Sequence, residues 1–126
     1  MAKKAKTGKS GSVASLLADK GYEFAHVGLF DLNGGFRERR IRTTGLDSVI
    51  GENGTFVNVL PQWDVGEAVA GSGPFVGEPV TLDPSSIRPY PFEEKAAIVV
   101  AEYKGPSEAL SPRSVLQRQI DRAAAA

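Results

Sequence analysis

The chain has 126 residues, of which 41% are hydrophobic and 24% are charged, and its 15 basic side chains balance 15 acidic ones. This is the composition of one globular domain, and zero net charge gives no general attraction to nucleic acid or anionic lipid. The sequence has no cysteine, which excludes disulfides and thiolate metal sites.

The chain has no segment typical of a membrane or secreted protein. Its longest apolar run, 96–101, has six residues, far fewer than the roughly 20 that a membrane-spanning helix needs. The lysine-rich start is followed by too short an apolar segment for a secretory signal. We therefore expect a cytoplasmic protein with no membrane partner.

The first half of the chain predicts an arm, a short helix and a β-hairpin. Residues 1–11 are rich in lysine, glycine and serine, which is typical of a flexible basic arm. Ser12 can cap a helix of about two turns that ends at Gly21. Residues 22–32 and 36–42 have strand composition, and Asn33-Gly34-Gly35 between them tolerates the positive φ of a tight turn.

The second half predicts short strands separated by loops. Residues 46–50 predict one helical turn closed by Gly51 and Gly54, and residues 55–60 predict a strand. The glycine- and proline-rich stretch 66–79 predicts a loop, with a short strand at 79–83 and an extended segment at 87–92 after it. Residues 96–103 are the strongest predicted strand, and their apolar run predicts a central strand without a solvent-exposed face.

The C-terminal residues predict a helix with few anchors. Ser111 and Pro112 supply a cap and a first-turn proline for residues 113–126, with Val115, Leu116 and Ile120 on one side. An isolated helix of about 14 residues is marginal in water. We therefore divide the chain into a basic arm (1–11), an α+β domain (12–108) and a helix (109–126) that we interpret as the start of a second, missing domain.

Two short motifs match known patterns without their context. Gly8-Lys9-Ser10 ends like a phosphate-binding loop, but Lys3 stands where that motif needs its first glycine, and no strand precedes it. Asn53-Gly54-Thr55 has the form of a glycosylation site, which needs a secreted protein. We interpret the first as part of the arm and the second as chance.

Charged and aromatic side chains give further candidates. Four arginines lie on one predicted strand: Arg37, Arg39, Arg40 and Arg42. They suit phosphate or nucleic acid, an exposed sheet edge or a subunit interface, and zero net charge favours the edge or the interface. His26, the only histidine, has no ligand cluster near it in the sequence, which favours a structural or interface role over a metal site or a general base. Trp63 is interpreted as an anchor under a loop rather than a stacking platform.

Four segments, in order, resemble the glutamine synthetase family. They are 27–34 (VGLFDLNG) with Arg37 and Arg39 behind it, 54–60 (GTFVNVL) followed by Trp63 and Asp64, 82–93 (LDPSSIRPYPFE), and 111–116 (SPRSVL). The order and spacing of all four carry the resemblance, which covers residues 22–126.

The resemblance implies an α+β fold that is β-grasp-like, with a small mixed sheet, short helices and a C-terminal helix that begins the family's catalytic domain. It implies a parent enzyme that uses ATP and magnesium or manganese to join ammonia or another amine to the γ-carboxyl group of glutamate, through γ-glutamyl phosphate. In the family the metal, glutamate and phosphate ligands lie in the catalytic domain, so we expect no metal or cofactor site in this chain. The small domain packs against the catalytic domain of the same or a neighbouring subunit and closes its active site, which implies a homo-oligomer.

The resemblance also implies a site residue on the loop that follows Phe56. In ordinary glutamine synthetases this loop supplies an aspartate that helps to bind and deprotonate ammonium, but here Val57-Asn58-Val59 occupies the position. The nearest acid is Asp64, which is either a catalytic residue acting in trans or a loop aspartate that caps a turn. The departure favours the divergent branch of the family, whose members join glutamate to larger amines or have no assigned substrate.

Two hypotheses remain. The chain is the small domain of a γ-glutamyl amine ligase, inactive alone, or it is a free-standing β-grasp module that binds a protein or RNA. A self-sufficient module should fold residues 113–126 against its own sheet, whereas a domain that needs a larger body should leave them loosely attached. A catalytic domain in its own right is disfavoured, because no nucleophile–base pair, metal cluster or phosphate loop is found in the sequence.

Overall fold

The computed structural model describes residues 11–50 and 54–126, so most of the predicted arm and Gly51 and Asn53 lie outside it. Its helices and strands are α1 (Val13–Asp19), β1 (Phe24–Phe30), β2 (Phe36–Arg42), α2 (Leu46–Ile50), β3 (Thr55–Val57), β4 (Gly77–Leu82), β5 (Arg88–Pro89), β6 (Ala96–Tyr103) and α3 (Pro112–Ala124). Short 3-10 turns lie at Thr43–Gly45, Leu60–Gln62, Pro84–Ser86 and Pro106–Ala109. Within these ranges, no helix is long and apolar enough to cross a membrane.

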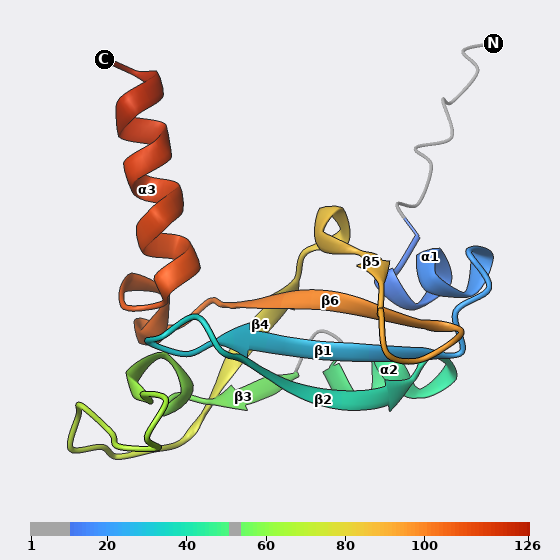
Figure 1. Ribbon diagram of the computed structural model, residues 1–126, viewed down its shortest axis with the longest axis horizontal. Helices are drawn as coiled ribbons and strands as arrows, with labels where there is room; N and C mark the ends of the chain where they lie inside the picture. Colours follow the sequence, from blue (N-terminus) through green and yellow to red (C-terminus); the bar gives the residue numbers. More distant parts are fainter. Residues whose placement is uncertain (1–10, 51–53) are drawn as a thin grey trace, which may run out of the picture.

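The strands form one curled mixed sheet in the order β2-β1-β6-β4-β3, and β5 also pairs with β6 (Figure 1). β1 and β6 are parallel, whereas the other pairs are antiparallel. β6 therefore lies at the centre, as its apolar sequence predicts. The predicted α+β, β-grasp-like fold is confirmed.

Glycine makes the first hairpin possible at two positions. Gly34 lies in the turn with φ +81°, a conformation that other residues rarely adopt. Gly28 faces the backbone of Arg37 on the paired strand, and a Cβ there would overlap the Arg37 carbonyl group. The hairpin therefore has the predicted strands, with a register that pairs Phe30 with Phe36 and Phe24 with Arg42.

The core lies on one face of the sheet. Inward-facing residues of β1 and β6, such as Val27, Val99 and Tyr103, are fully or almost fully buried and pack with Leu17 of α1 and Leu46 of α2. The prediction that β6 has no exposed face is wrong, because Ile98, Val100 and Glu102 alternate with the core residues and are only half-buried. The helices cover one face only, so the other face of the central strand is partly open to solvent.

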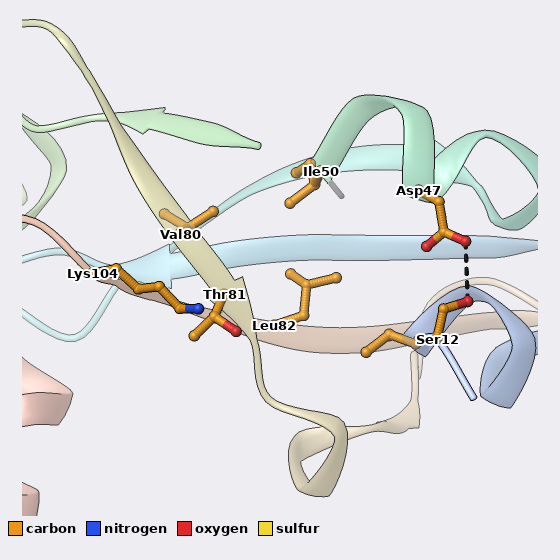
Figure 2. A pocket seen from close by; sticks show the side chains of 8 residues that line it. Ser12, Asp47, Ile50, Val80, Thr81, Leu82 and Lys104 are labelled. Atoms are coloured by element: carbon orange, nitrogen blue, oxygen red, sulfur yellow. Dashed lines mark hydrogen bonds between the residues drawn. The ribbon is translucent and has the colours of Figure 1, made fainter. Parts of the chain in front are cut away.

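α1 and α2 are joined at the edge of the core. The Ser12 hydroxyl accepts a hydrogen bond from the Ser15 amide, as predicted for an N-cap, and donates to Asp47 on α2 over 3.0 Å. Figure 2 shows this pair at the rim of a groove whose other walls are aliphatic, with Ile50, Val80 and Leu82 facing it. Lys104 stands on the opposite rim. The polar groups do not converge on one point, so we interpret the groove as a packing junction.

The predicted strand at 55–60 is too long, and the predicted loop at 66–79 extends too far, because a strand begins before its end. β3 ends at Val57, and Leu60–Gln62 form a 3-10 turn that includes Pro61. A proline cannot donate the ladder hydrogen bond that a longer strand would need. β4 begins at Gly77, opposite Val57, so residues 77–79, which were predicted as loop, belong to the sheet.

Candidate functional site

The candidate residue Asp64 lies on a loop that is attached to the tip of the first hairpin. The Leu32 amide donates to the Trp63 carbonyl over 3.0 Å, and the Val65 amide donates to the Asn33 side chain over 2.9 Å. Trp63 also forms an isolated bridge with Val69. These contacts hold the loop beside the hairpin although 30 residues of sequence or more separate the two.

Asp64 closes a tight turn within that loop. Its Oδ1 accepts from the Ala68 amide over 2.8 Å, and its own amide donates to the Ala68 carbonyl over 3.0 Å. Its carbonyl also accepts from the Glu67 amide over 3.0 Å. This geometry agrees with the turn-capping interpretation of Asp64, and its catalytic role in trans stays a prediction.

Arg37 connects this loop to the hairpin. Its Nε donates to Asp31 Oδ2 over 3.0 Å, and its guanidinium lies 4.8 Å from the centre of the Trp63 ring. Burial alone would raise the pKa of Asp31, but hydrogen bonds from the Gly35 amide, Arg37 and the Asn33 amide outweigh it and lower the pKa. Asp31 is therefore a charged, buried anchor that fixes the turn and Arg37 together.

Trp63 is an anchor, as interpreted from the sequence. It packs against the core cluster from beneath the loop, with Arg37 stacked on its ring. Its indole Nε1 is buried and has no hydrogen-bond acceptor among the described residues. A buried N–H group without an acceptor is rare in folded proteins because it loses its hydrogen bond to water. The Trp63 indole is such a group in the described interior.

The four arginines lie on an edge strand, which agrees with one of the two favoured interpretations. β2 is the last strand on its side of the sheet. Arg39 crosses to the opposite end of the curled sheet, where its Nη1 donates to the Thr55 carbonyl over 3.3 Å and its guanidinium covers the Phe56 ring at 4.4 Å. Arg40 and Arg42 cover the Phe24 ring. Arg39, Arg40 and Arg42 thus each cover an aromatic ring of the chain.

Asn58 lies in the segment Val57-Asn58-Val59, where the resemblance to the glutamine synthetase family implies an aspartate. Its Nδ2 donates to Glu78 Oε1 over 3.1 Å, and its Oδ1 accepts from the Val76 amide over 3.0 Å. Burial opposes the charge of Glu78, but hydrogen bonds from Ser107 and Asn58 outweigh it and lower the pKa of Glu78. Asn58 thus joins the two ends of the 58–76 loop and satisfies a buried carboxylate.

His26 has two carboxylate partners that the sequence did not reveal. Its side chain is 7% exposed, its Nδ1 lies 2.6 Å from Glu38 Oε1, and its Nε2 lies 2.9 Å from Glu93 Oε2. The Tyr90 ring stacks on it at 3.7 Å. The hairpin brings Glu38 beside His26 and the segment after β5 brings Glu93, and these contacts agree with the structural role interpreted from the sequence.

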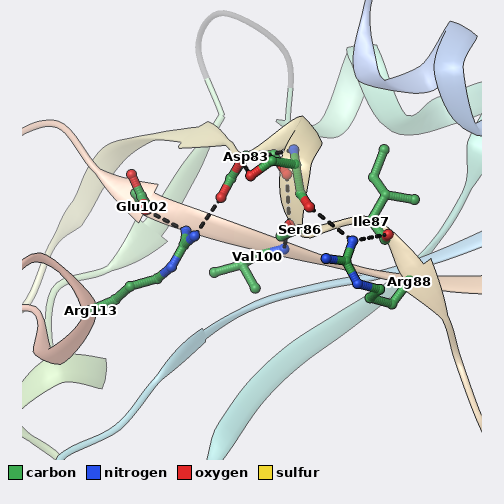
Figure 3. Close-up of polar contacts among 8 residues, drawn as sticks. Asp83, Ser86, Ile87, Arg88, Val100, Glu102 and Arg113 are labelled. Atoms are coloured by element: carbon green, nitrogen blue, oxygen red, sulfur yellow. Dashed lines mark hydrogen bonds and ion pairs between the residues drawn. The ribbon is translucent and has the colours of Figure 1, made fainter. Parts of the chain in front are cut away.

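α3 is attached to the sheet at its base only and then leaves it (Figure 1). Figure 3 shows Arg113 reaching from the first turn of α3 to Asp83 and Glu102, with which it forms two ion pairs. Beyond that turn, Leu116 is 60% exposed and Ile120 is 51% exposed. The residues that the structure describes therefore leave the apolar side of this helix uncovered.

Acidic and histidine side chains do not gather into a metal site in the described part of the chain, where no group of three or more could hold an ion. Glu38 and Glu93 lie on opposite nitrogens of His26 and do not converge. The donor set that magnesium or manganese prefers, several carboxylate or carbonyl oxygens around one point, is thus not assembled in these residues.

Comparison with known proteins relates the fold to one enzyme. No protein-family model and no curated protein matches the chain. Among solved structures, the ADP complex of GmaS, in its conformation 1, superposes with a TM-score of 0.67 at 22% identity, over 90% of this chain and 26% of the GmaS chain. Ligand-free GmaS gives a TM-score of 0.66 at 22% identity, over 89% of this chain and 26% of that one.

GmaS is a glutamine synthetase-like γ-glutamylmethylamide synthetase. This chain spans 26% of the length of the GmaS chains that it matches. The predicted resemblance to the glutamine synthetase family is thereby confirmed at the level of the fold, which this chain shares with a part of GmaS.

Proposed function

We propose that this chain is the small β-grasp domain of a glutamine synthetase-like ligase that uses ATP to join an amine to the γ-carboxyl group of glutamate. In this role it is inactive alone. It forms one wall of an active site whose other walls, including the ligands of ATP and of magnesium or manganese, belong to a catalytic domain of the same or a neighbouring subunit in a homo-oligomer. The expected cytoplasmic location stays a prediction.

The observation that carries this proposal is the extent of the fold match. The likeness to GmaS covers 90% of this chain but only 26% of the GmaS chain. A match over most of this chain supports this role over that of an unrelated module.

The surface of the chain supports the same role. α3 presents Leu116 and Ile120 to solvent, and the Asp64 loop presents Val65, which is 79% exposed, and Val76. Exposed apolar residues grouped on one helix face or one loop are typical of surfaces that another body covers. The alternative module would fold α3 against its own sheet, so the uncovered helix supports the ligase role over it.

The surroundings of Asn58 bear on which amine the ligase would use as its acceptor. Both ends of its amide are engaged within the loop, and a carboxylate at that position would face Glu78. In this proposal the segment Val57-Asn58-Val59 carries no ammonium-binding aspartate, and the neighbouring loop residues Val57, Val65 and Val76 are aliphatic. We propose an alkylamine, such as the methylamine implied by the name of GmaS, rather than ammonia as the acceptor.

Two measurements test the proposal. The pure chain, incubated with ATP, magnesium, glutamate and methylamine, should release no ADP, and amine-dependent ADP release would overturn the assignment. In the second measurement, a GmaS variant lacking the matched quarter is co-expressed with this chain. We expect co-elution of the two and methylamine-dependent ADP release above that of the truncated GmaS alone.

The control in the second measurement is the double variant Leu116→Ser/Ile120→Ser, which removes the exposed side chains of α3 without touching the core. It should abolish co-elution. Co-elution that survives this change, or binding to unrelated proteins at the same strength, would favour the general interaction module.

A further inference from the structure

The segment of residues 90–95, here termed the strap, crosses the outer face of the first hairpin. It follows β5 and ends where β6 begins, with the Tyr90 amide donating to the Ala96 carbonyl over 2.8 Å. At its far end Lys95 pairs with Glu23 over 2.7 Å. Between these points Tyr90 and Glu93 lie over His26 of β1.

The hydrogen bonds of His26 require two ring protons. An ionised carboxylate can only accept, so each ring nitrogen that faces one must donate. Glu38 faces Nδ1 and Glu93 faces Nε2. The neutral ring carries one proton, and in either tautomer a lone pair would then face a carboxylate oxygen at 2.6 or 2.9 Å.

The two carboxylates are not equally free to move. Glu38 belongs to β2, which the sheet holds beside β1 along their whole length. Glu93 belongs to the strap, whose tip residue Phe92 is 85% exposed. When the ring carries one proton, the sheet contact is the one that persists, and the strap contact is the one that yields.

The other charged groups around the ring have defined places. On β2, Arg40 binds both Glu93 oxygens. On the strap, the Tyr90 hydroxyl donates to Glu38 over 3.3 Å. On β6 the residue opposite His26 is Ile98, which is uncharged. Arg88 of β5 is opposite Ile98 in turn. Its guanidinium donates to the carbonyls of Ser85 and Ile87. Burial, and then the charges of Glu38 and Glu93, raise the pKa of Tyr90, so its hydroxyl keeps its proton.

We propose that His26 is a proton-dependent latch: with both ring nitrogens protonated it holds the strap on the hairpin, and loss of one proton loosens the strap. The released form keeps the Arg40–Glu93 ion pair but loses the hydrogen bond between His26 Nε2 and Glu93. Raising the pH therefore mobilises the strap without unfolding the sheet. This inference is independent of the proposed ligase role, because it rests on contacts inside this chain.

NMR tests the latch directly, because the chain has a single histidine. In ¹⁵N-labelled protein, both ring N–H protons should be visible at low pH. As the pH rises, the Nε2 proton should disappear, and the backbone amide signals of residues 92–94 should shift with the same midpoint. The Trp63 indole signal, from another part of the fold, should stay unchanged and report an intact structure.

Variants separate the latch from a general charge effect. Glu93→Gln should move the loss of the second ring proton and the strap transition together to lower pH. Glu94→Gln removes the same charge from an exposed neighbour on the strap and should leave both unchanged. The latch is overturned if the ring carries one proton throughout, if the strap amides do not follow the ring, or if the two variants behave alike.

Discussion

At the scale of single residues, Asn58 shows how one amide can hold a loop. It donates to buried Glu78 and accepts from the Val76 amide. Replacing Asn58 by Asp keeps the acceptor but turns the donor into a second carboxylate beside Glu78. We expect Asn58→Asp to lower the free energy of unfolding by about 1–3 kcal/mol, measured by urea denaturation at pH 7.

Asn33→Asp is the matched control for that change. The Asn33 Oδ1 accepts from the Val65 amide over 2.9 Å, and a carboxylate oxygen can accept in the same way. Its effect on stability should be within about 0.5 kcal/mol. Equal losses in the two variants would mean that the Glu78 contact does not govern the loop.

The residue scale is also where the sequence was least informative. His26 and Glu38 could have been paired, because a hairpin with a turn at 33–35 sets Glu38 diagonally across from His26. Glu93 could not, since it is 67 residues from His26 and reaches it through a segment with no helical or strand period. The turn-capping geometry of Asp64 fits one of the two interpretations made from its loop sequence.

At the scale of elements, local chemistry predicted most of the fold. The hairpin, the α1 cap and β6 follow from Gly34, Ser12 and an unbroken apolar run, all of which act within a few residues. β3 was overestimated because its composition continues past Val57, whereas its length is set by pairing with β4. Strand ends depend on the partner strand, and the partner is not visible in the local sequence.

α3 leads to a prediction about stability. Leu116 is 60% exposed on this helix, whereas Leu17 of α1 is fully buried. Leu116→Ser should change the free energy of unfolding by no more than about 0.5 kcal/mol. Leu17→Ala should lower it by about 2–5 kcal/mol. A large loss for Leu116→Ser would mean that α3 is packed against the domain in solution.

α3 also leads to a prediction about hydrogen exchange. Its contacts with the sheet are concentrated at Arg113, and no buried side chain lies along it. The amides of residues 116–124 should therefore exchange much faster than those of β6, because local opening of a thinly packed helix is nearly free. Protection equal to that of β6 would contradict this and would favour the self-sufficient module.

At the scale of the whole molecule, acid should be the condition that unfolds the domain. Five carboxylates have lowered pKa values: Glu23, Asp31, Glu78, Asp83 and Glu93. The Arg40 guanidinium, then the His26 ring, hold the pKa of Glu93 at about 2, below the usual 4.5.

The sign of the pH dependence follows from these shifts. A carboxylate with a lowered pKa in the folded state stabilises the fold above its usual pKa and ceases to do so as it is protonated. The melting temperature, followed by circular dichroism, should be level from pH 7 to about pH 5. It should then fall steadily towards pH 2, near the folded pKa of Glu93. A melting temperature that stays level down to pH 2 would contradict the assignment of these contacts.

The attachment of α3 at one end makes the helix a lever. Its 13 residues extend about 20 Å from the Arg113 pivot at 1.5 Å per residue. A tilt of roughly 15° at the pivot would sweep the far end through about 5 Å over that length. Salt that screens the two ion pairs of Arg113 would thus change the direction of α3. A protein surface that contacts α3 would then turn relative to the sheet.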